Sequence, residues 1–369
     1  MRNASQNNGF LFSVGGLVLF GLTILATASA VLAFRHTGDN YYYLKHQVFS
    51  GVIPGIALFF FASRFPHQRL KKLALPMMLF SIVLMMLVFV PQLGIQIGKA
   101  TRWVDFGFFS FQPSELLKFA SVVYLAALFE SRKRDITHMK ESFIPFLCIS
   151  GVVGLLLIAQ PDLGTLSVVM STALFVYFLA GAKMAHVGAV ILLGFMVLGI
   201  FVFGLGYERD RVEVFLGMRS DIADKAYQIN TALRMIGESG VFGLGYGQSQ
   251  QKSTVYLPEP MGDSIVAVVG QELGFLGIAA VIALFGMLGW YGYAIARAAP
   301  TVFGSILAGG IVSWILIQAT INISAISGMI PLTGIPLPFI SYGSTSYVVL
   351  LTACGVVYNI QRTSEEGRV

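Results

Sequence analysis

Asp263 is the residue of this chain whose position most favours chemistry. It closes the segment Tyr256-Leu257-Pro258-Glu259-Pro260-Met261-Gly262 and stands directly before a long apolar run. A carboxylate held by a rigid Pro-X-Pro approach, at the border between water and hydrocarbon, could accept a proton from a substrate that is half lipid and half sugar. An Asp before an apolar run is also a common helix N-cap, and the spacing alone favours that structural role.

A second polar group begins with Arg102-Trp103-Val104-Asp105 and continues in Pro113-Ser114-Glu115-Leu116-Leu117-Lys118. Pro113 suits the start of a helix, which puts Glu115 and Lys118 at i and i+3 on one face, where they can pair at the membrane border. Such a pair could be a structural ion pair that orients the helix, or it could face a substrate. Trp103 taken by itself is explained by an interfacial anchor.

A third polar group, Gln160-Pro161-Asp162-Leu163-Gly164-Thr165, reads as a tight connection between two helices. As a turn it needs no function, because Pro and Asp start helices and Gly tolerates bends. Asp162 falls on the same predicted side of the membrane as Glu115, Lys118 and Asp263. Four ionisable groups on one side indicate a polar cavity.

Two further segments connect apolar runs. The polar stretch of about residues 207–263 contains Lys225–Arg234, whose apolar spacing predicts an amphipathic helix along the interface, and then the glycine-rich residues 238–248. No strand precedes those glycines and no Lys-Ser/Thr pair follows them, so a plain flexible loop is favoured over a nucleotide-binding loop. Residues 328–346 carry no charge and three prolines, which is typical of a re-entrant loop that lines a cavity.

Composition predicts the fold class. The chain is 56% hydrophobic and 11% charged, with 40 glycines, which is typical of an integral membrane protein. We therefore expect an all-α polytopic membrane protein, a single domain over residues 1–369, with about ten transmembrane helices and a large extracytoplasmic loop between the seventh and the eighth. The candidate helices are Phe10–Phe34, Gln47–Ser63, Leu73–Leu93, Ser114–Phe129, Phe143–Ala159, Gly164–Gly181, His186–Leu205, Ile265–Arg297, Val302–Ala325 and Ser346–Ile360. The run Ile265–Arg297 is too long for a straight crossing, so tilt, a kink or an interfacial extension must absorb the mismatch.

Lysine and arginine in the short loops predict the orientation. One set of loops carries most of the basic residues, together with those at both termini, and should face the cytoplasm. Both termini are then cytoplasmic, and Asp263 lies on the extracytoplasmic side. The net charge of +6 is mostly this topology signal, and no basic patch supports nucleic-acid binding. Cys148 and Cys354 sit in apolar segments without metal-ligand spacing.

Five motifs in this order resemble the SEDS family, which comprises the FtsW, RodA and SpoVE proteins. They are Arg102-Trp103, Phe111-Gln112-Pro113-Ser114-Glu115, Gln160–Thr165, Tyr256-Leu257-Pro258-Glu259 with Asp263, and Pro336-Leu337-Pro338-Phe339-Ile340-Ser341-Tyr342-Gly343. The resemblance implies an inverting peptidoglycan glycosyltransferase that polymerises lipid II and releases undecaprenyl pyrophosphate. It also implies a class B penicillin-binding protein, a transpeptidase, as partner, together with other proteins of the division or elongation machinery.

The resemblance also assigns residues. Asp263 corresponds to the essential aspartate of the family and is the expected catalytic residue. The expected substrate-binding residues are Arg102, Trp103, Glu115, Lys118, Asp162, Glu259, Ser341 and Tyr342. Two departures concern the polar neighbours of the aspartate: Met261-Gly262 stands where the family usually has His-Thr or His-Asn, and Ser341-Tyr342-Gly343-Ser344-Thr345-Ser346 replaces Ser-Tyr-Gly-Gly-Ser-Ser. Gln251-Lys252 and Thr333-Gly334 look more like the division-type FtsW proteins than the elongation-type RodA proteins.

The implied reaction needs one base, because a pyrophosphate leaves readily without a general acid. With its ordinary pKa of about 3.9, Asp263 would be ionised. Lys118 and Arg102 are the first candidates to stabilise the departing diphosphate, with Arg209, Arg211 and Arg219 as weaker ones. No cofactor is expected with certainty. A divalent cation, Mg²⁺ or Mn²⁺, could share the role of these side chains, but no metal ligands are assigned. A lipid II flippase and a non-catalytic scaffold for the transpeptidase remain the alternatives.

Overall fold

A computed structural model describes residues 2–97, 100–107, 109–204, 206, 209–218, 223–249 and 257–366, and most of them are helical. The α-helices are α1 (Arg2–Ala28), α2 (Ala30–Thr37), α3 (Tyr42–Gln47), α4 (Ile53–Arg64), α5 (His67–Leu87), α6 (Pro113–Ser131), α7 (Ile144–Ala159), α8 (Leu163–Leu179), α9 (Met184–Gly199), α10 (Arg209–Phe215), α11 (Ala223–Glu238), α12 (Ile265–Ala298), α13 (Val302–Ile326) and α14 (Ser344–Glu366). Short helical segments of other pitch are η1 (Val48–Val52), η2 (Lys133–Asp135), η3 (Met139–Phe143) and η4 (Ile200–Gly204).

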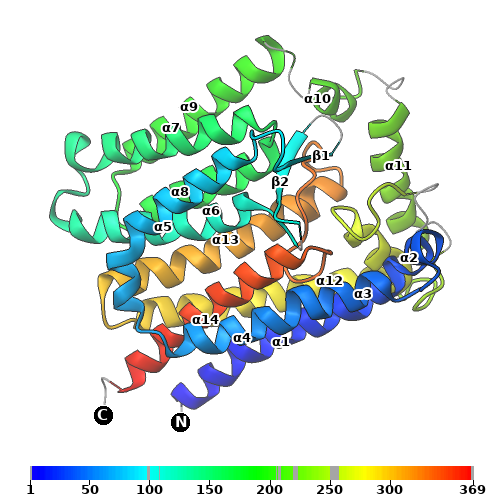
Figure 1. The fold of residues 1–369 in the computed structure, drawn as a ribbon, viewed down its shortest axis with the longest axis horizontal. Coiled ribbons are helices and arrows are strands. Elements are labelled where there is room, and N and C mark those ends of the chain that lie inside the picture. Colours follow the sequence, from blue (N-terminus) through cyan, green and yellow to red (C-terminus); the bar gives the residue numbers. More distant parts are fainter. Residues whose placement is uncertain are drawn as a thin grey trace.

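Long apolar helices confirm the predicted class of polytopic membrane protein. Seven helical stretches within the described residues are long and apolar enough to cross a membrane, and α8 is apolar but shorter. The stretches are Asn8–Ala28, Tyr42–Arg64, His67–Leu87, Met139–Ala159, Met184–Gly204, Ile265–Ala298 and Val302–Ile326. Helices α6, α8 and α14 lie among them in the same bundle (Figure 1). The predicted count of ten is not confirmed by this criterion.

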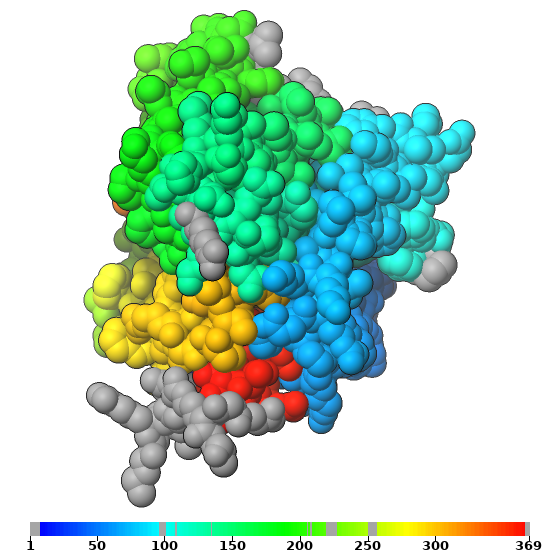
Figure 2. All heavy atoms as spheres, turned by 90° about the vertical axis from the view of Figure 1, so that its left-hand side faces the viewer, coloured from blue at the N-terminus to red at the C-terminus, as the bar shows by residue number. Residues whose placement is uncertain are grey.

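The two ends of the bundle differ. At one end, Gln68 Nε2 donates to Thr301 Oγ1 over 2.8 Å and the Lys71 ammonium pairs with Glu130 over 2.6 Å, which joins the starts of α5 and α13 to the end of α6. Figure 2 faces this end and shows the connections around α5, α7 and α12 packed side by side. Both chain termini lie there, whereas α10, α11 and the start of α12 lie at the opposite end (Figure 1).

Helix α12 is kinked, which is one of the three ways in which so long an apolar run was expected to fit a membrane. Gly274 has φ 65° and ψ −158°, which no helix contains. A break in a membrane helix frees backbone groups that must find partners. The loop after α11 supplies them: the Gly245 N–H donates to the Glu272 carbonyl over 3.0 Å, and the Phe275 N–H donates to the Gly240 carbonyl over 3.0 Å. The glycine-rich segment predicted as a flexible loop is therefore packed on the kink.

A Cβ at Gly243 would overlap with the Glu272 carbonyl, so only glycine fits at that position of the loop. The predicted amphipathic helix is confirmed as α11, which precedes this loop and buries Ala232 and Met235. Together, α11 and the glycine loop cover the first half of α12.

Within the described residues, the strands form one small antiparallel sheet. Strand β2 (Ala100–Asp105) lies between β1 (Gly94–Ile97) and β3 (Ser110–Phe111). Trp103 pairs with Ile95 in the register of the first two strands. β-Branched and aromatic residues alternate here, at Ile95, Ile97, Thr101 and Trp103, and such alternation favours strands. The predictions for Trp103, an interfacial anchor or a substrate-binding residue, included no strand at this position.

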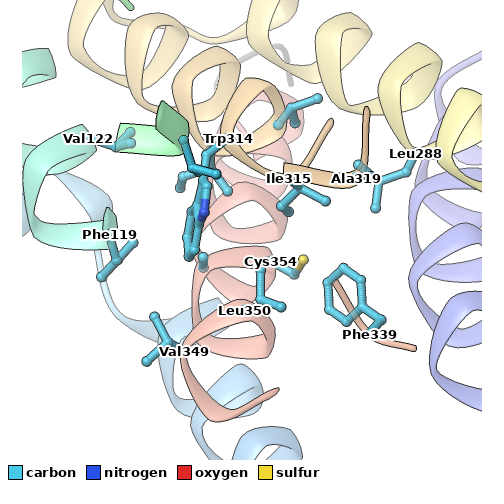
Figure 3. Packing of buried hydrophobic residues seen from close by; sticks show 14 of the residues in the cluster. Phe119, Val122, Leu288, Trp314, Ile315, Ala319, Phe339, Val349, Leu350 and Cys354 are labelled. Atoms are coloured by element: carbon cyan, nitrogen blue, oxygen red, sulfur yellow. The ribbon is translucent and has the colours of Figure 1, made fainter. Parts of the chain in front are cut away.

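Helix α13 forms the centre of the core. Trp314 is fully buried, and Figure 3 shows it between α6, which carries Phe119 and Val122, and the side chains of α14. Phe339, which follows α13 in the chain, returns into the bundle beside Leu350 and Cys354 (Figure 3). The non-helical segment of residues 327–343, called here the return loop, is therefore partly buried inside the bundle, as predicted for a re-entrant loop.

Candidate functional site at the start of helix 12

Asp263 lies in the turn that leads into α12 and is partly exposed. The N-cap position belongs to Ser264, so Asp263 does not take the capping role that its spacing favoured. Its Oδ1 accepts from Gln228 Nε2 and from Ser264 Oγ, both over 3.4 Å, and Gln228 also donates to Ser264 Oγ over 3.0 Å. These long hydrogen bonds leave the carboxylate with free accepting capacity toward a ligand.

Arg211 of α10 shares the space beside this carboxylate. A Cβ built on Gly334 would lie 3.8 Å from Arg211 Nη2 and 3.9 Å from Asp263 Oδ2. Gly334 has φ 69°, a backbone conformation that favours glycine. Arg211 Nη1 also donates to the Leu332 carbonyl over 3.2 Å, which fixes the guanidinium against the return loop. A carboxylate and a guanidinium therefore face a space that the missing side chain of Gly334 leaves open.

Glu259 shapes the turn that carries Asp263. Its backbone has φ 49°, which is rare for a residue other than glycine. In this conformation its carbonyl accepts from the Gly262 N–H over 3.0 Å and from the Ser264 N–H over 3.3 Å. Strain of this kind costs about 1–3 kcal/mol and persists where the surrounding structure imposes it. The Glu259 side chain is exposed, so its charge acts on the site from the water side.

The environment raises the pKa of Asp263 to about 6. Burial is the main cause, because it penalises the charged form, and the Glu259 carboxylate adds repulsion. The Arg211 guanidinium and the hydrogen bonds from Ser264 and Gln228 act in the opposite direction. Asp263 therefore does not have the ordinary pKa, which applies to a carboxylate that water reaches freely. Asp263 remains mostly ionised at neutral pH but is close to the range in which a carboxylate works as a general base.

The return loop holds the backbone around Asp263. Asn322 of α13 donates through Nδ2 to the Asp263 carbonyl over 2.8 Å and to the Ile335 carbonyl over 2.7 Å. Ser341 Oγ donates to the Gly262 carbonyl over 2.6 Å, and the Tyr342 N–H donates to the Met261 carbonyl over 2.8 Å. The predicted residues Ser341 and Tyr342 thus lie next to the Asp263 turn, in contact with its backbone.

Glu115 and Lys118 form the predicted pair, with 2.8 Å between Lys118 Nζ and Glu115 Oε1. Both side chains are buried, and Lys118 Nζ also donates to Gln318 Oε1 over 2.8 Å and lies 5.4 Å from the centre of the Trp314 ring. Gln318 Nε2 donates to the Pro336 carbonyl over 3.0 Å. This geometry supports the structural interpretation of the pair, since it ties α6 to α13 and to the return loop.

Arg102 and Asp162 also meet, with 3.7 Å between Arg102 Nε and Asp162 Oδ2. Asp162 is the N-cap of α8 and accepts from the Thr165 N–H over 3.1 Å and from Thr165 Oγ1 over 2.8 Å. A Cβ on Gly164 would lie 2.5 Å from the Thr333 carbonyl oxygen, so the turn packs directly on the return loop. Both ionisable groups are thus engaged in structural contacts.

The return loop therefore touches all three predicted groups of polar residues. It contacts the Asp263 turn through Ser341, the Lys118 pair through Gln318, and the Asp162 turn through Gly164. Arg211 replaces Lys118 and Arg102 as the first candidate to stabilise the departing diphosphate. Lys118 and Arg102 are paired with other carboxylates, whereas Arg211 lies beside Asp263. Arg209 pairs with Glu213 at 2.5 Å. Arg219, Tyr256 and the pair Gln251-Lys252 lie outside the described residues.

Sequence reasoning missed Gln228, Gln318 and Asn322, which position the site. A signal for two of them was present: Trp314, Gln318 and Asn322 are spaced by four residues and form a polar stripe on one face of a strongly apolar helix. Gln228 had no comparable signal, because it stands on an amphipathic helix where polar residues are expected. In the described part of the chain, no group of three or more His, Cys, Asp or Glu side chains could hold a metal ion.

Comparisons with known proteins agree with this architecture. Residues 8–366 match the model of the FtsW/RodA/SpoVE family, described as "Cell cycle protein". Among curated relatives, stage V sporulation protein E of Bacillus subtilis is 38% identical over 352 residues, covering 94% of each chain. A probable peptidoglycan glycosyltransferase FtsW of Geobacter sulfurreducens is 34% identical over 344 residues, covering 93% of this chain and 92% of the relative.

Two solved structures share the fold. One is described as "Structural coordination of polymerization and crosslinking by a peptidoglycan synthase complex", with a TM-score of 0.80 and 25% identity over 96% of this chain and 97% of that one. The other is the rod shape determining protein RodA of Thermus thermophilus, with a TM-score of 0.70 and 25% identity over 96% of each chain. The motifs, the helical bundle and these matches agree, and the chain belongs to the FtsW/RodA/SpoVE family.

Proposed function

We propose that this chain is a peptidoglycan glycosyltransferase that polymerises lipid II into β-1,4 glycan strands. One observation carries the proposal: the Asp263 carboxylate and the Arg211 guanidinium face the same space beside Gly334. A base next to a cation is what a reaction needs when a sugar hydroxyl attacks a sugar diphosphate. Relatives named as probable peptidoglycan glycosyltransferases support the same conclusion.

The reaction forms one C–O bond and breaks another. The 4-hydroxyl of the acceptor N-acetylglucosamine attacks the anomeric carbon of the donor N-acetylmuramic acid, and its proton passes to Asp263. The bond between that carbon and the diphosphate oxygen breaks, and its electron pair leaves with undecaprenyl pyrophosphate. Attack from the face opposite the leaving group inverts the anomeric carbon, so an α-linked donor gives a β-linked product. Arg211 stabilises the negative charge on the departing diphosphate.

In our proposal, two ion pairs support this site without touching the substrate. They are Lys118 with Glu115 and Arg102 with Asp162. Their contacts hold α6, α8 and α13 against the return loop, which carries Gly334. The predicted substrate-binding roles stay predictions for all eight residues: Arg102, Trp103, Glu115, Lys118, Asp162, Glu259, Ser341 and Tyr342. The divalent cation stays a prediction without assigned ligands; within the described residues, no group of three or more His, Cys, Asp or Glu side chains could hold a metal ion.

The site should act outside the cytoplasm. The basic connections lie at the bundle end that holds both termini, and the excess of Lys and Arg favours a cytoplasmic position for that end. The whole of residues 1–369 then works as one integral membrane domain with the Asp263 site on the extracytoplasmic face. The likeness to a peptidoglycan synthase complex supports a class B penicillin-binding protein, within the division or elongation machinery, as its partner.

A polymerisation assay tests the proposal. The purified chain is given fluorescent lipid II in detergent, with and without a cognate transpeptidase, and glycan products are separated on a gel. Asp263→Asn should abolish polymer formation. Glu238→Gln is the matched control, since Glu238 is an exposed carboxylate of the same polar loop that pairs with Arg234 at 3.2 Å. Wild-type polymerisation by Asp263→Asn would refute the catalytic assignment.

The same preparations distinguish the two alternative functions. A flippase would move labelled lipid II across liposomes without forming glycan and would tolerate loss of a proton acceptor. A scaffold would form no glycan unless the transpeptidase preparation supplied a polymerase of its own. If the isolated wild-type chain forms polymer, it is an enzyme, and neither a flippase nor a scaffold function alone describes it.

A further inference from the structure

A group of aromatic side chains lies beside the Asp263 turn and has no part in the mechanism above. It consists of Tyr42, Tyr43 and His46 of α3 together with Tyr342 of the return loop, and is called here the tyrosine–histidine cluster. Tyr42 and His46 are one helical turn apart, so their rings lie on one face of α3. Tyr42 is 44% exposed, which leaves ring surface open to a ligand.

The rings of the cluster hold one another in fixed orientations. Tyr42 and His46 stack with 6.4 Å between ring centres, while Tyr43 meets Tyr342 edge-on at 5.4 Å. The Tyr342 hydroxyl lies 2.8 Å from His46 Nδ1, and the Tyr43 hydroxyl lies 3.0 Å from Nδ1 of His36. Ring contacts and hydrogen bonds of this kind give a rigid surface that combines aromatic faces with polar edges.

The cluster is attached to the turn that carries Asp263. Tyr342 belongs to the tyrosine–histidine cluster, and its backbone N–H donates to the Met261 carbonyl of the Asp263 turn over 2.8 Å. On the α10 side, the same Asp263 has Arg211 as its neighbour. The Asp263 turn therefore contacts the cluster through Tyr342 and lies beside a cation of α10.

The chemistry of the cluster selects a neutral ligand. A diphosphate is bound by cations, and Lys45, which stands between Tyr43 and His46 in the sequence, is engaged with Asp39 at 2.7 Å. Aromatic faces with hydroxyl groups at their edges suit a pyranose ring, which has an apolar C–H face and a rim of hydroxyl and acetamido groups. Rings that serve only as membrane anchors need neither mutual hydrogen bonds nor contact with a catalytic turn.

We propose that Tyr42, Tyr43, His46 and Tyr342 form a subsite for an N-acetylhexosamine unit of the glycan next to Asp263. This inference rests on the proposed function, of which it names one saccharide subsite. The subsite would hold a sugar by stacking and neutral hydrogen bonds, while Arg211 attracts the diphosphate. Because the sugar is held by the aromatic rings and the diphosphate by Arg211, the glycan would lie in one orientation beside Asp263.

Saccharide binding tests the subsite without any reaction. The probe is the N-acetylglucosamine tetrasaccharide, and saturation-transfer NMR on the full chain in nanodiscs measures its binding. Tyr42→Ala should weaken binding about 3- to 10-fold, the range expected for loss of one aromatic contact. Tyr41→Ala is the matched control: Tyr41 is the neighbouring tyrosine, 54% exposed, and the ring contacts above do not involve it. It should bind the probe as the wild type does.

Tyr42→Leu separates recognition from anchoring and from misfolding. It keeps apolar surface toward the membrane but removes the aromatic face, so it should lose the probe as Tyr42→Ala does, with an unchanged elution profile and thermal midpoint. Binding by Tyr42→Leu and Tyr42→Ala equal to that of Tyr41→Ala would overturn the subsite. Asp263→Asn should still bind the tetrasaccharide. If Asp263→Asn also polymerises lipid II normally, the catalytic proposal fails while the subsite is judged by the tyrosine variants alone.

Discussion

Replacing Glu259 by Gln should move the acid limb of the polymerisation rate to lower pH. The site raises the pKa of Asp263 from 3.8 to about 6, and repulsion by Glu259 is the second cause after burial. A shift of roughly two units corresponds to about 3 kcal/mol against the ionised form. Removal of one neighbouring charge leaves the burial in place, so the pKa should fall by up to about one unit.

The raised pKa of Asp263 also predicts how the wild-type polymerisation rate depends on pH. A base acts only when ionised, so the rate should rise with pH through about 6. About 91% of a group with that pKa is ionised at pH 7 and about 9% at pH 5, so the rate should drop roughly tenfold between these values. A carboxyl with its ordinary pKa would lose less than about 10% of the rate over the same range.

The assay is the initial rate of fluorescent lipid II polymerisation at saturating substrate from pH 4.5 to 8. Thermal unfolding of each variant at pH 5 shows whether loss of rate reflects loss of fold. Arg211→Gln should shift the acid limb in the opposite direction, to higher pH, because removal of the cation should raise the pKa of Asp263. Acid limbs that coincide in the wild type and both variants would refute the electrostatic account of Asp263.

Three further predictions concern the residues around the site. Gly334→Ala should reduce the polymerisation rate at least tenfold, because its methyl group would lie between Arg211 and Asp263. Gly328→Ala is the control, since Gly328 has a similar φ of 70°. It should lower the thermal midpoint as much as Gly334→Ala does but keep the wild-type rate. Lys118→Met should cost about 3–5 kcal/mol in unfolding by denaturant, and the double change with Glu115→Leu should recover most of it. Asn322→Ala should lower kcat without shifting the acid limb, which the pH series above would show.

Local spacing predicted the parts of the fold that depend on local contacts. Pro113 starts α6 and the i, i+3 pair of Glu115 and Lys118 forms, because both follow from the geometry of one helix. The apolar run of α12 exceeds the thickness of a bilayer, so a mismatch was predictable, but its length left tilt, a kink and an interfacial extension open. That the kink falls at Gly274 depends on the glycine loop that packs there, and no local pattern contains that information.

The candidate site was predictable only in part, for the same reason. Asp263 stood out because a carboxylate at the edge of hydrocarbon needs an explanation. Arg211 was ranked below Lys118 and Arg102, because sequence alone could not show which cations are already paired. Tyr342 followed from a family motif, but its contacts with Tyr43 and His46 required the packing of α3 on the return loop.

The return loop explains why so many side chains converge on Asp263. A non-helical segment within a membrane bundle leaves carbonyl groups without the partners that a helix provides, and the bundle must supply other donors. The carbonyls of Leu332, Ile335 and Pro336 accept hydrogen bonds from side chains of Arg211, Asn322 and Gln318, respectively.

Each of these donors also meets a residue of the proposed reaction or its support: Arg211 lies beside Asp263, Asn322 holds the Asp263 carbonyl, and Gln318 holds Lys118. The hydrogen bonds that make the loop stable in the membrane are therefore the ones that place the base and the cation. A substitution that removes one of these donors should move the site without touching the substrate, so its effect should appear in kcat before it appears in binding.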